Sequence, residues 1–328
     1  VIFSITQLCK PDPMDDPMDD PMDDPMDEIK RENKMKNITL YIITVIVWGS
    51  TWLAIKYQLG SVDPMVSVVY RFGLAAALLM FFCYVKGLNL KFALKDHLFM
   101  ALLGILLFSV NYWLVYVAEL YLTSGLVAVL FSSIVFMNIA NGSIFLGTAV
   151  EKKMVAGAVL GIIGIIMIFM PEIKDFDLSD KGVFGLSIGF LSVLLASFGN
   201  ITSARNTKNN IPIVQANAYG MIYGTILMAV IAISLGKEFS FVNSIPYVGS
   251  LFYLSVFGSI IAFGSYLTLI GSLGADKASY AIMLVPVVAL VLSSFFEGYS
   301  WNFSAVLGMI LVVGGNFLAL SKRRLSSV

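Results

Sequence analysis

The sequence predicts an all-helical membrane protein with ten transmembrane helices, arranged as two inverted five-helix repeats. Three observations support this prediction: the composition, the recurrence of long apolar runs, and an internal duplication. Apolar side chains make up 58% of the 328 residues and charged side chains only 13%, about half the share in an average soluble domain. Too few polar side chains remain to cover a water-exposed globule of this size, so the chain is predicted to lie in a lipid bilayer.

Apolar runs long enough to cross a hydrocarbon core of about 30 Å as a helix recur from Ile38 onward. Helices are predicted because amides inside a bilayer must pair internally, and because the runs are too uniformly apolar for barrel strands. The predicted spans are residues 38–57, 64–86, 97–119, 123–146, 154–171, 182–204, 211–235, 246–272, 277–297 and 301–320.

Lysine and arginine residues are unevenly distributed between the predicted loops. With a cytoplasmic amino terminus, fifteen basic residues fall on the inner side and three on the outer side. The positive-inside rule therefore predicts a multi-pass protein of the cytoplasmic (inner) membrane with both termini in the cytoplasm.

The first 37 residues differ in composition from the rest. Pro-Met-Asp-Asp repeats three times in residues 13–24, a fourth copy follows, and no helical or strand periodicity is present. Residues 1–37 are therefore predicted to be a disordered, acidic cytoplasmic tail. A solvated leader is the preferred interpretation, and a binding tail or a metal-chelating strip is the alternative. Met35, directly before an apolar run, looks like a natural initiation site, so residues 1–34 are expected to be dispensable, and whether they are native is left open.

The second half of the chain repeats the first. Since five spans is an odd number, the second copy enters the membrane from the opposite side, which predicts an inverted repeat. Two such copies give carriers nearly isoenergetic outward-open and inward-open states around a shared ligand site, so transport is the favoured function. The matched residues are Phe145, Gly147, Val155, Gly157, Leu160 and Gly164, which recur as Phe296, Gly298, Val306, Gly308, Leu311 and Gly315 at a constant offset of 151.

Four motifs carry a family resemblance: Trp48-Gly49-Ser50, Pro64 with Arg71-Phe72, Phe145-Leu146-Gly147, and Pro286 followed by Phe296-Glu297-Gly298. On these motifs, residues 38–320 resemble the paired EamA-like domains of the drug/metabolite transporter superfamily. The resemblance implies alternating access and a central cavity lined by both halves, and members commonly move amino acids, other metabolites or drugs. The proline that it implies in the fourth span is Val135 here.

The predicted domain organisation combines the spans with this resemblance. Two EamA-like repeats follow the acidic tail, with a short loop between them and a basic segment after them. The predicted boundaries are residues 38–171 for the first repeat, 172–181 for an external linker, 182–320 for the second repeat and 321–328 for a cytoplasmic C-terminus.

Arg71 is the most informative candidate for a binding residue. It lies about seven residues inside the second span, which at 1.5 Å per residue is on the order of 10 Å below the outer end. A charge at that depth needs a partner or a cavity. Arg71 is therefore expected either to hold an anionic group, such as a substrate carboxylate, or to form a structural pair with Glu119 or with helix-end carbonyls, and both interpretations stay open.

The other candidates are aromatic, amide and acidic side chains. Trp48 and Trp52 share one helix face, as do Tyr112, Tyr116 and Glu119, so these faces either line a cavity or form part of an interfacial aromatic belt. Buried asparagines either face the cavity or bond between helices. Tyr219 is the favoured contact from the second half. The predicted substrate-binding residues are Trp48, Trp52, Tyr70, Arg71, Asn111, Tyr112, Tyr116, Glu119, Asn138, Asn200, Tyr219, Tyr223, Tyr266 and Tyr280.

The chain is predicted to be a transporter and not an enzyme. One histidine and two cysteines offer no metal site, no nucleotide-binding glycine loop is present, and no cofactor is expected. The predicted function is a secondary transporter or facilitator of small organic metabolites, with amino acids or related amphipathic compounds favoured. Nucleoside-like or sulfonium metabolites are the alternative substrates, and an intramembrane lipid-modifying enzyme, which would need clustered acids or histidines, is the alternative class.

The expected partners are the bilayer and a small-molecule substrate, with protons as a candidate coupling ion through Glu119. Scattered basic residues indicate no nucleic-acid partner. The oligomeric state is left open.

Deletion of residues 1–34 tests the interpretation of the tail. Because a disordered leader makes no packing contacts, the shortened chain should transport its substrate at the wild-type rate in reconstituted vesicles. Loss of transport would show that the tail has a function.

Overall fold

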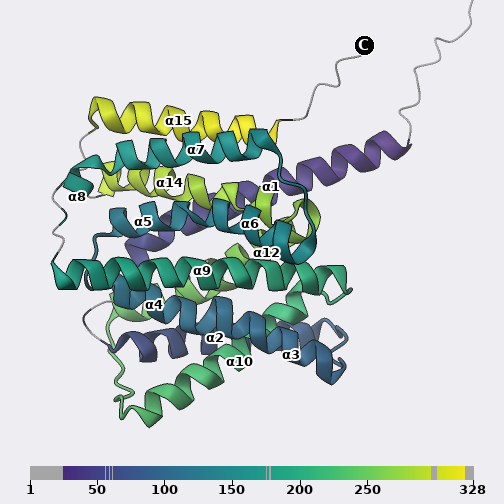
Figure 1. The fold of residues 1–328 in the computed structure, drawn as a ribbon. Helices are drawn as coiled ribbons and strands as arrows, with labels where there is room; N and C mark the ends of the chain where they lie inside the picture. The colour runs from purple at the N-terminus through teal and green to yellow at the C-terminus, as the bar shows by residue number, and fades with distance from the viewer. Residues whose placement is uncertain are drawn as a thin grey trace, which may run out of the picture. The chain divides into compact units, whose positions relative to one another are not determined.

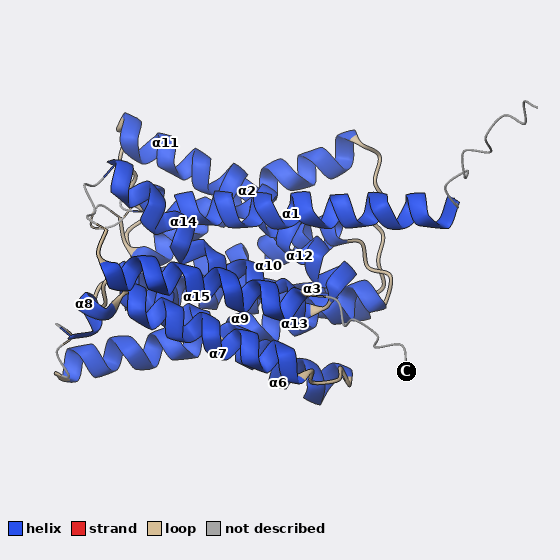
Figure 2. Ribbon diagram, turned by 90° about the horizontal axis from the view of Figure 1, so that it is seen from above, coloured by secondary structure: helices blue, strands red, loops and turns tan. Residues whose placement is uncertain are grey.

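The computed structural model describes residues 25–55, 57–58, 60, 62–174, 176, 179–296 and 301–321, without the side chains of residues 25–28, Trp52, Ser124, Gly125, Glu172 and Ser293. All regular structure in this part of the chain is helical, which confirms the predicted all-helical fold class (Figure 2). The chain divides into two compact units between Ile38 and Thr39, and the packing described below is that of the second unit.

The first half contains five spans. Asp63 caps the second of these, because its side chain accepts a hydrogen bond of 2.8 Å from the backbone N–H of Met65, while Pro64 opens the helix with a fixed φ. The elements are α1 (Pro25–Ile55), α2 (Pro64–Val85), α3 (Leu94–Leu103), the π-helical turn η1 (Gly104–Ser109), α4 (Val110–Ala118), α5 (Ser124–Ser132), α6 (Ile134–Leu146), α7 (Lys152–Ile168) and the short α8 (Met170–Lys174).

The second half again contains five spans, and polar side chains cap several of its helices. Ser179, Ser244 and Asn302 each accept a hydrogen bond from a backbone N–H in the first turn of the helix that follows. The elements are α9 (Asp180–Lys208), α10 (Ile213–Ser234), α11 (Ile245–Tyr253), the π-helical turn η2 (Leu254–Ile261), α12 (Ala262–Leu273), α13 (Ala275–Ala278), α14 (Tyr280–Phe296) and α15 (Phe303–Leu320).

The number of spans agrees with the sequence prediction. Within the described residues, nine helical segments are long and apolar enough to cross a membrane. The tenth is α7, whose 17 residues make a helix about 26 Å long, at the lower limit for a transmembrane helix.

Corresponding helices of the two halves run in opposite directions. The loop after α10 contacts the beginning of α2, where Lys237 pairs with Asp63 at 2.8 Å. The loop after α2 contacts the beginning of α10, where the Tyr219 hydroxyl donates to the Leu90 carbonyl at 2.9 Å. The same irregularity also occurs in both halves, because a π-helical turn interrupts the third span of each. The two repeats are therefore inverted.

Repeated glycines bring α7 and α15 together along their length (Figure 1). A Cβ atom on Gly164 would lie 2.5 Å from the Gly308 carbonyl oxygen, and one on Gly157 would lie 2.5 Å from that of Gly315. The same short distances hold in the reverse direction. Gly164 thus contacts the repeat counterpart of Gly157, and Gly157 contacts the repeat counterpart of Gly164. This pairing is expected for antiparallel copies, and the small residues let the two backbones approach closely.

Two details differ from the expectations. The helix α1 begins at Pro25, so residues 25–37 are helical where a disordered tail is predicted; this segment is rich in the helix formers Glu, Lys and Met after a proline at the first position. Residues 1–24 lie outside the described residues. In the fourth span of the first half, the helix is broken at Ser133, although Val135 stands where the resemblance implies a proline. In the fourth span of the second half, α14 continues through Pro286.

Substitution of Gly164 by valine should destabilise the protein, because the new side chain would overlap a backbone carbonyl that cannot move without separating α7 from α15. Overpacking of this kind costs about 1–3 kcal/mol. Thermal unfolding in detergent, followed by size-exclusion chromatography, measures the change. Gly314→Val is the control, because Gly314 is exposed and a Cβ atom there would have no neighbouring atom within 4 Å. Equal midpoints for both variants would contradict the proposed packing.

Candidate functional site

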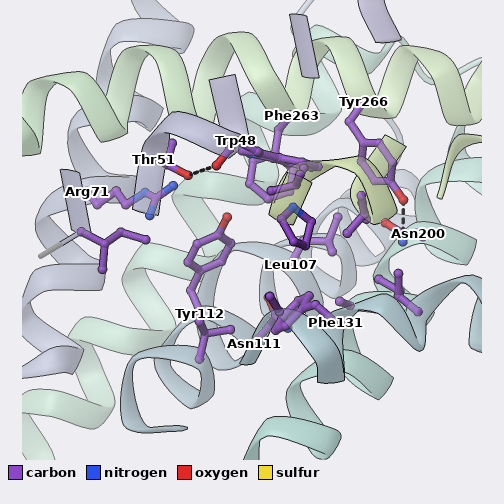
Figure 3. Close-up of a pocket in the computed structure, with 18 residues that line it drawn as sticks. Trp48, Thr51, Arg71, Leu107, Asn111, Tyr112, Phe131, Asn200, Phe263 and Tyr266 are labelled. Carbon is purple, nitrogen blue, oxygen red and sulfur yellow. Dashed lines mark hydrogen bonds between the residues drawn. The ribbon is translucent and has the colours of Figure 1, made fainter. Parts of the chain in front are cut away.

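A cavity of about 110 Å³ lies between helices of both halves (Figure 3). Its walls are mainly aromatic and aliphatic, with a few polar groups. In the view of Figure 3, Arg71 lies on one side, Asn200 with Tyr266 on the other, and Trp48, Tyr112 and Phe263 between them. The lining residues are Trp48, Thr51, Ile55, Arg71, Leu107, Asn111, Tyr112, Val115, Ala128, Phe131, Ile134, Ala196, Asn200, Phe263, Tyr266, Ile282, Val285 and Pro286.

Arg71 is held from the opposite half of the protein. Its side chain is 1% exposed, and its Nε donates to the Ser259 hydroxyl oxygen at 3.0 Å. The guanidinium carbon lies 4.6 Å from the centre of the Tyr112 ring, within the range of a cation–π contact. Its Nη1 atom is buried and makes no hydrogen bond to any described residue. The guanidinium is therefore fixed in place with one donor nitrogen unused.

Arg71 and Glu119 interact electrostatically, but they form no ion pair within 4.0 Å in the described part of the chain. A buried charge without a close counter-ion is unfavourable in a bilayer. The described residues thus provide the Arg71 guanidinium with no close counter-ion.

The π-helical turn η2 provides the groups that fix this side of the cavity. In a π turn, carbonyl and side-chain positions are shifted relative to an α-helix, and such turns are frequent at functional sites. The Gly258 carbonyl accepts a hydrogen bond of 3.1 Å from the Trp48 indole, and the Ser255 hydroxyl donates to the Arg71 carbonyl at 2.9 Å. The Trp48 ring also packs 5.0 Å from the Phe263 ring.

Asparagines form hydrogen bonds between helices at the other side of the cavity. The Asn200 amide donates to the Tyr266 hydroxyl at 3.1 Å and to the Asn138 carbonyl oxygen at 3.5 Å. Asn138 in turn donates to the Ala275 carbonyl at 3.2 Å, and Asn111 donates to the Ser192 carbonyl at 2.5 Å. The Asn200 side-chain oxygen is buried and accepts no hydrogen bond from the described residues, so an acceptor is available there.

The structure brings six of the predicted side chains to the cavity: Trp48, Arg71, Asn111, Tyr112, Asn200 and Tyr266. Three others lie directly behind this lining. Asn138 bonds to Asn200, while Tyr116 and Glu119 continue the Tyr112 face of α4 and interact with Arg71. The side chain of Trp52 lies outside the described residues.

Four predicted tyrosines do not line the cavity. Tyr70 precedes Arg71 and is therefore turned by about 100° around α2, so that its hydroxyl donates to the Phe239 carbonyl at 3.0 Å. Tyr280 donates to the Met154 carbonyl, beside α7. Both side chains serve contacts between helices.

Tyr219 and Tyr223, the other two, pack around His97 at the beginning of α3. The Tyr219 and His97 rings are 4.8 Å apart, and the Tyr223 hydroxyl lies 2.9 Å from the His97 Nδ1. Gly220 follows Tyr219 in α10, and a Cβ atom there would lie 3.3 Å from the Met100 carbonyl oxygen and 3.2 Å from the Phe108 ring. The neighbouring Tyr219 points elsewhere on the helix, which explains why it does not reach the cavity.

Sequence reasoning missed several residues of the site. Thr51 lies three residues after Trp48 on the same helix face, so helical spacing could have identified it. Phe263 is one phenylalanine among 24 in the chain and has no distinguishing signal. Ser259 reaches Arg71 only because of the π turn, which no local sequence pattern predicted.

Comparisons with known proteins are consistent over nearly the whole chain. Residues 35–170 and 183–321 each match the model of the EamA-like transporter family. Protein PagO of Salmonella typhimurium is 23% identical over 287 residues, which cover 87% of this chain and 93% of PagO. The uncharacterized inner membrane transporter YedA of Escherichia coli K12 is 28% identical over 290 residues, covering 84% of this chain and 90% of YedA.

A solved structure also shares the fold. One crystal structure aligns with a TM-score of 0.72 at 16% identity, covering 87% of this chain and 96% of its own. At this identity the similarity shows the fold alone.

The variant Tyr266→Phe should lower the thermal stability, because it removes the hydroxyl that accepts a hydrogen bond from Asn200. Hydrogen bonds between transmembrane helices contribute about 0.6 kcal/mol on average and at most about 1.7. The unfolding midpoint in detergent measures the loss, with Tyr84→Phe as the control, since Tyr84 is 77% exposed. An unchanged midpoint for Tyr266→Phe would show that this bond contributes nothing.

Proposed function

Because the chain belongs to the EamA-like transporter family, we propose that it is a secondary transporter or facilitator of small organic metabolites that works by alternating access. The relatives called inner membrane transporters support the inner membrane as its location. The inverted repeats support the mechanism, since each half can adopt the conformation of the other.

One observation carries the proposed substrate class: the unused Nη1 donor of the buried Arg71 guanidinium at the wall of the cavity. A carboxylate that accepts from Nη1 would form a charge-assisted hydrogen bond, which contributes about 1.5–3 kcal/mol. The aromatic walls formed by Trp48, Tyr112 and Phe263 would hold an apolar part of the same molecule. We therefore propose a substrate with an anionic group and an apolar portion.

Amino acids and related amphipathic compounds fit this description best. At the side opposite Arg71, the unpaired Asn200 oxygen offers an acceptor for a donor group on the substrate. A nucleoside-like or sulfonium metabolite is the second candidate, because flat rings and cations both stack on aromatic side chains. The Arg71 cation disfavours the sulfonium compound unless it also carries a carboxylate.

The cavity of about 110 Å³ holds several water molecules but is smaller than typical ligand pockets. A metabolite therefore requires lining side chains or whole helices to move on entry. This requirement agrees with a carrier that opens to one side at a time.

A ligand-induced thermal-shift screen with amino acids, nucleosides and cationic metabolites tests the proposal. An anionic amphipathic compound should raise the unfolding midpoint of the wild-type protein. In Arg71→Gln the apparent affinity should fall by about 10- to 100-fold, as expected from a lost charge-assisted hydrogen bond. Arg71→Lys should retain part of the affinity, because it keeps the charge but not the planar geometry.

Arg205→Gln is the matched control. Arg205 lies in the last turn of α9, where its guanidinium carbon is 3.5 Å from the centre of the Phe99 ring, and it does not line the cavity. Full affinity in Arg71→Gln, or an equal loss in Arg205→Gln, would contradict the assigned role of Arg71. Counterflow in liposomes with the compound identified then measures transport itself.

A further inference from the structure

A second group of polar atoms lies beside Arg71, outside the cavity lining. The Ser67 hydroxyl, the Tyr116 hydroxyl, the Glu119 Oε1 and the Tyr247 hydroxyl are all buried and make no hydrogen bond to the described residues. Arg71 Nη1 shares this property. We call these five residues the polar subsite.

These side chains come together from three helices. Ser67 and Arg71 are four residues apart on one face of α2, and Tyr116 and Glu119 are three apart on one face of α4. Tyr247, from α11 of the second half, interacts with Ser67 and Tyr116, and Tyr116 interacts with Arg71 and Glu119. The polar subsite is therefore contiguous and contains residues of both halves.

The unpaired atoms indicate that the polar subsite binds something mobile. Native proteins leave only a few buried polar atoms unpaired per hundred residues, because each one costs stability, and water or a ligand usually satisfies them. Here five such atoms are concentrated in one place, in side chains of which Ser67, Arg71 and Tyr116 are each 1% exposed. Both donors and acceptors are present, so water can connect them.

Glu119 is the acid of the polar subsite. It lies one residue beyond Leu94–Ala118, the segment that is apolar enough to cross a bilayer. Burial raises the pKa of its carboxyl group, and the Arg71 guanidinium opposes this effect. The groups that face it are Arg71 from α2 and the Tyr112 and Tyr116 hydroxyls from α4, with Tyr247 from α11 beyond Tyr116. Its protonation state thus depends on whether Arg71 is otherwise engaged.

We propose that Glu119 binds a coupling proton and that Arg71 is shared between Glu119 and the anionic group of the transported solute. This inference rests on the proposed function. In the empty site, the Arg71 cation stabilises the Glu119 carboxylate. When a solute carboxylate binds Arg71, that stabilisation is lost, and Glu119 takes one proton from water on the side to which the site is open.

Binding of a solute carboxylate without the proton would place two carboxylates beside one guanidinium, and this form is disfavoured. Protonation of Glu119 removes one of the two negative charges. A zwitterionic amino acid is neutral overall, so the loaded site with a neutral Glu119 carries one positive charge more than the empty site. One proton therefore travels with one solute, in the same direction.

The test uses the full chain in proteoliposomes with a labelled mixture of the standard amino acids and a pH-sensitive dye inside. With the interior one pH unit more alkaline, the wild-type protein should accumulate label up to about tenfold, the limit for one proton per solute. Addition of the mixture should also acidify the interior. Glu119→Gln should lose the gradient-driven accumulation and the acidification.

Glu238→Gln is the matched control, since it makes the same change at an exposed acid in the loop between α10 and α11. It should behave like the wild type. Gradient-driven accumulation that persists in Glu119→Gln would overturn the proton site. Counterflow by the wild type without proton entry would overturn the coupling and leave the proposed function standing. Absence of counterflow in the wild type would overturn both the coupling and the proposed transport of amino acids.

A second measurement does not depend on how the variant folds. Wild-type protein in weakly buffered detergent solution should take up protons when the amino-acid mixture is added, at most one per chain. No uptake under conditions where the mixture raises the unfolding midpoint would overturn the coupling.

Discussion

The contact between Arg71 and the π-helical turn η2 determines how the two halves meet at the cavity. A guanidinium buried within a membrane span is tolerated only where its donors are satisfied or face a polar space. The π turn supplies the Ser259 acceptor for the Arg71 side chain and the Ser255 donor for its carbonyl. Gly258 makes room between them, since a Cβ there would lie 3.1 Å from Arg71 Nη2 and 3.0 Å from Thr51. The position of the cation thus depends on a local irregularity of the opposite repeat.

The cavity is asymmetric although the two repeats share one architecture. Arg71 of α2 contacts η2, whereas in the other pair of elements Gly220 of α10 contacts η1, where its carbonyl oxygen would lie 2.0 Å from a Cβ atom on Gly104. One half therefore provides a charged group and the other provides close helix packing at the equivalent place. An asymmetric site can give a bound molecule one orientation, while the symmetric scaffold around it gives two similar overall conformations.

Contacts between the halves lie at both ends of α2. Near Pro64, Asp63 pairs with Lys237, and near Val85, the Leu90 carbonyl accepts a hydrogen bond from Tyr219. Because the repeats are inverted, the loop after each of the helices α2 and α10 lies against the beginning of the other. Tyr219, which the sequence suggested as a ligand contact, takes part in one of these contacts.

The sequence alone established the helical class, the number of spans and the inverted duplication, and it singled out Arg71 as a charge within a span, because bilayer thickness dictates the length of apolar runs and a buried charge stands out among them. The face of each helix that points inward became known from the packing of the helices. In a membrane the outer surface is as apolar as the core, so the sequence of a span carries little contrast between its faces. For that reason Tyr70 and Tyr219, which the sequence suggested as binding residues, lie away from the cavity lining, while Phe263 and Ser259, positioned by packing and by a π turn, could not be identified beforehand.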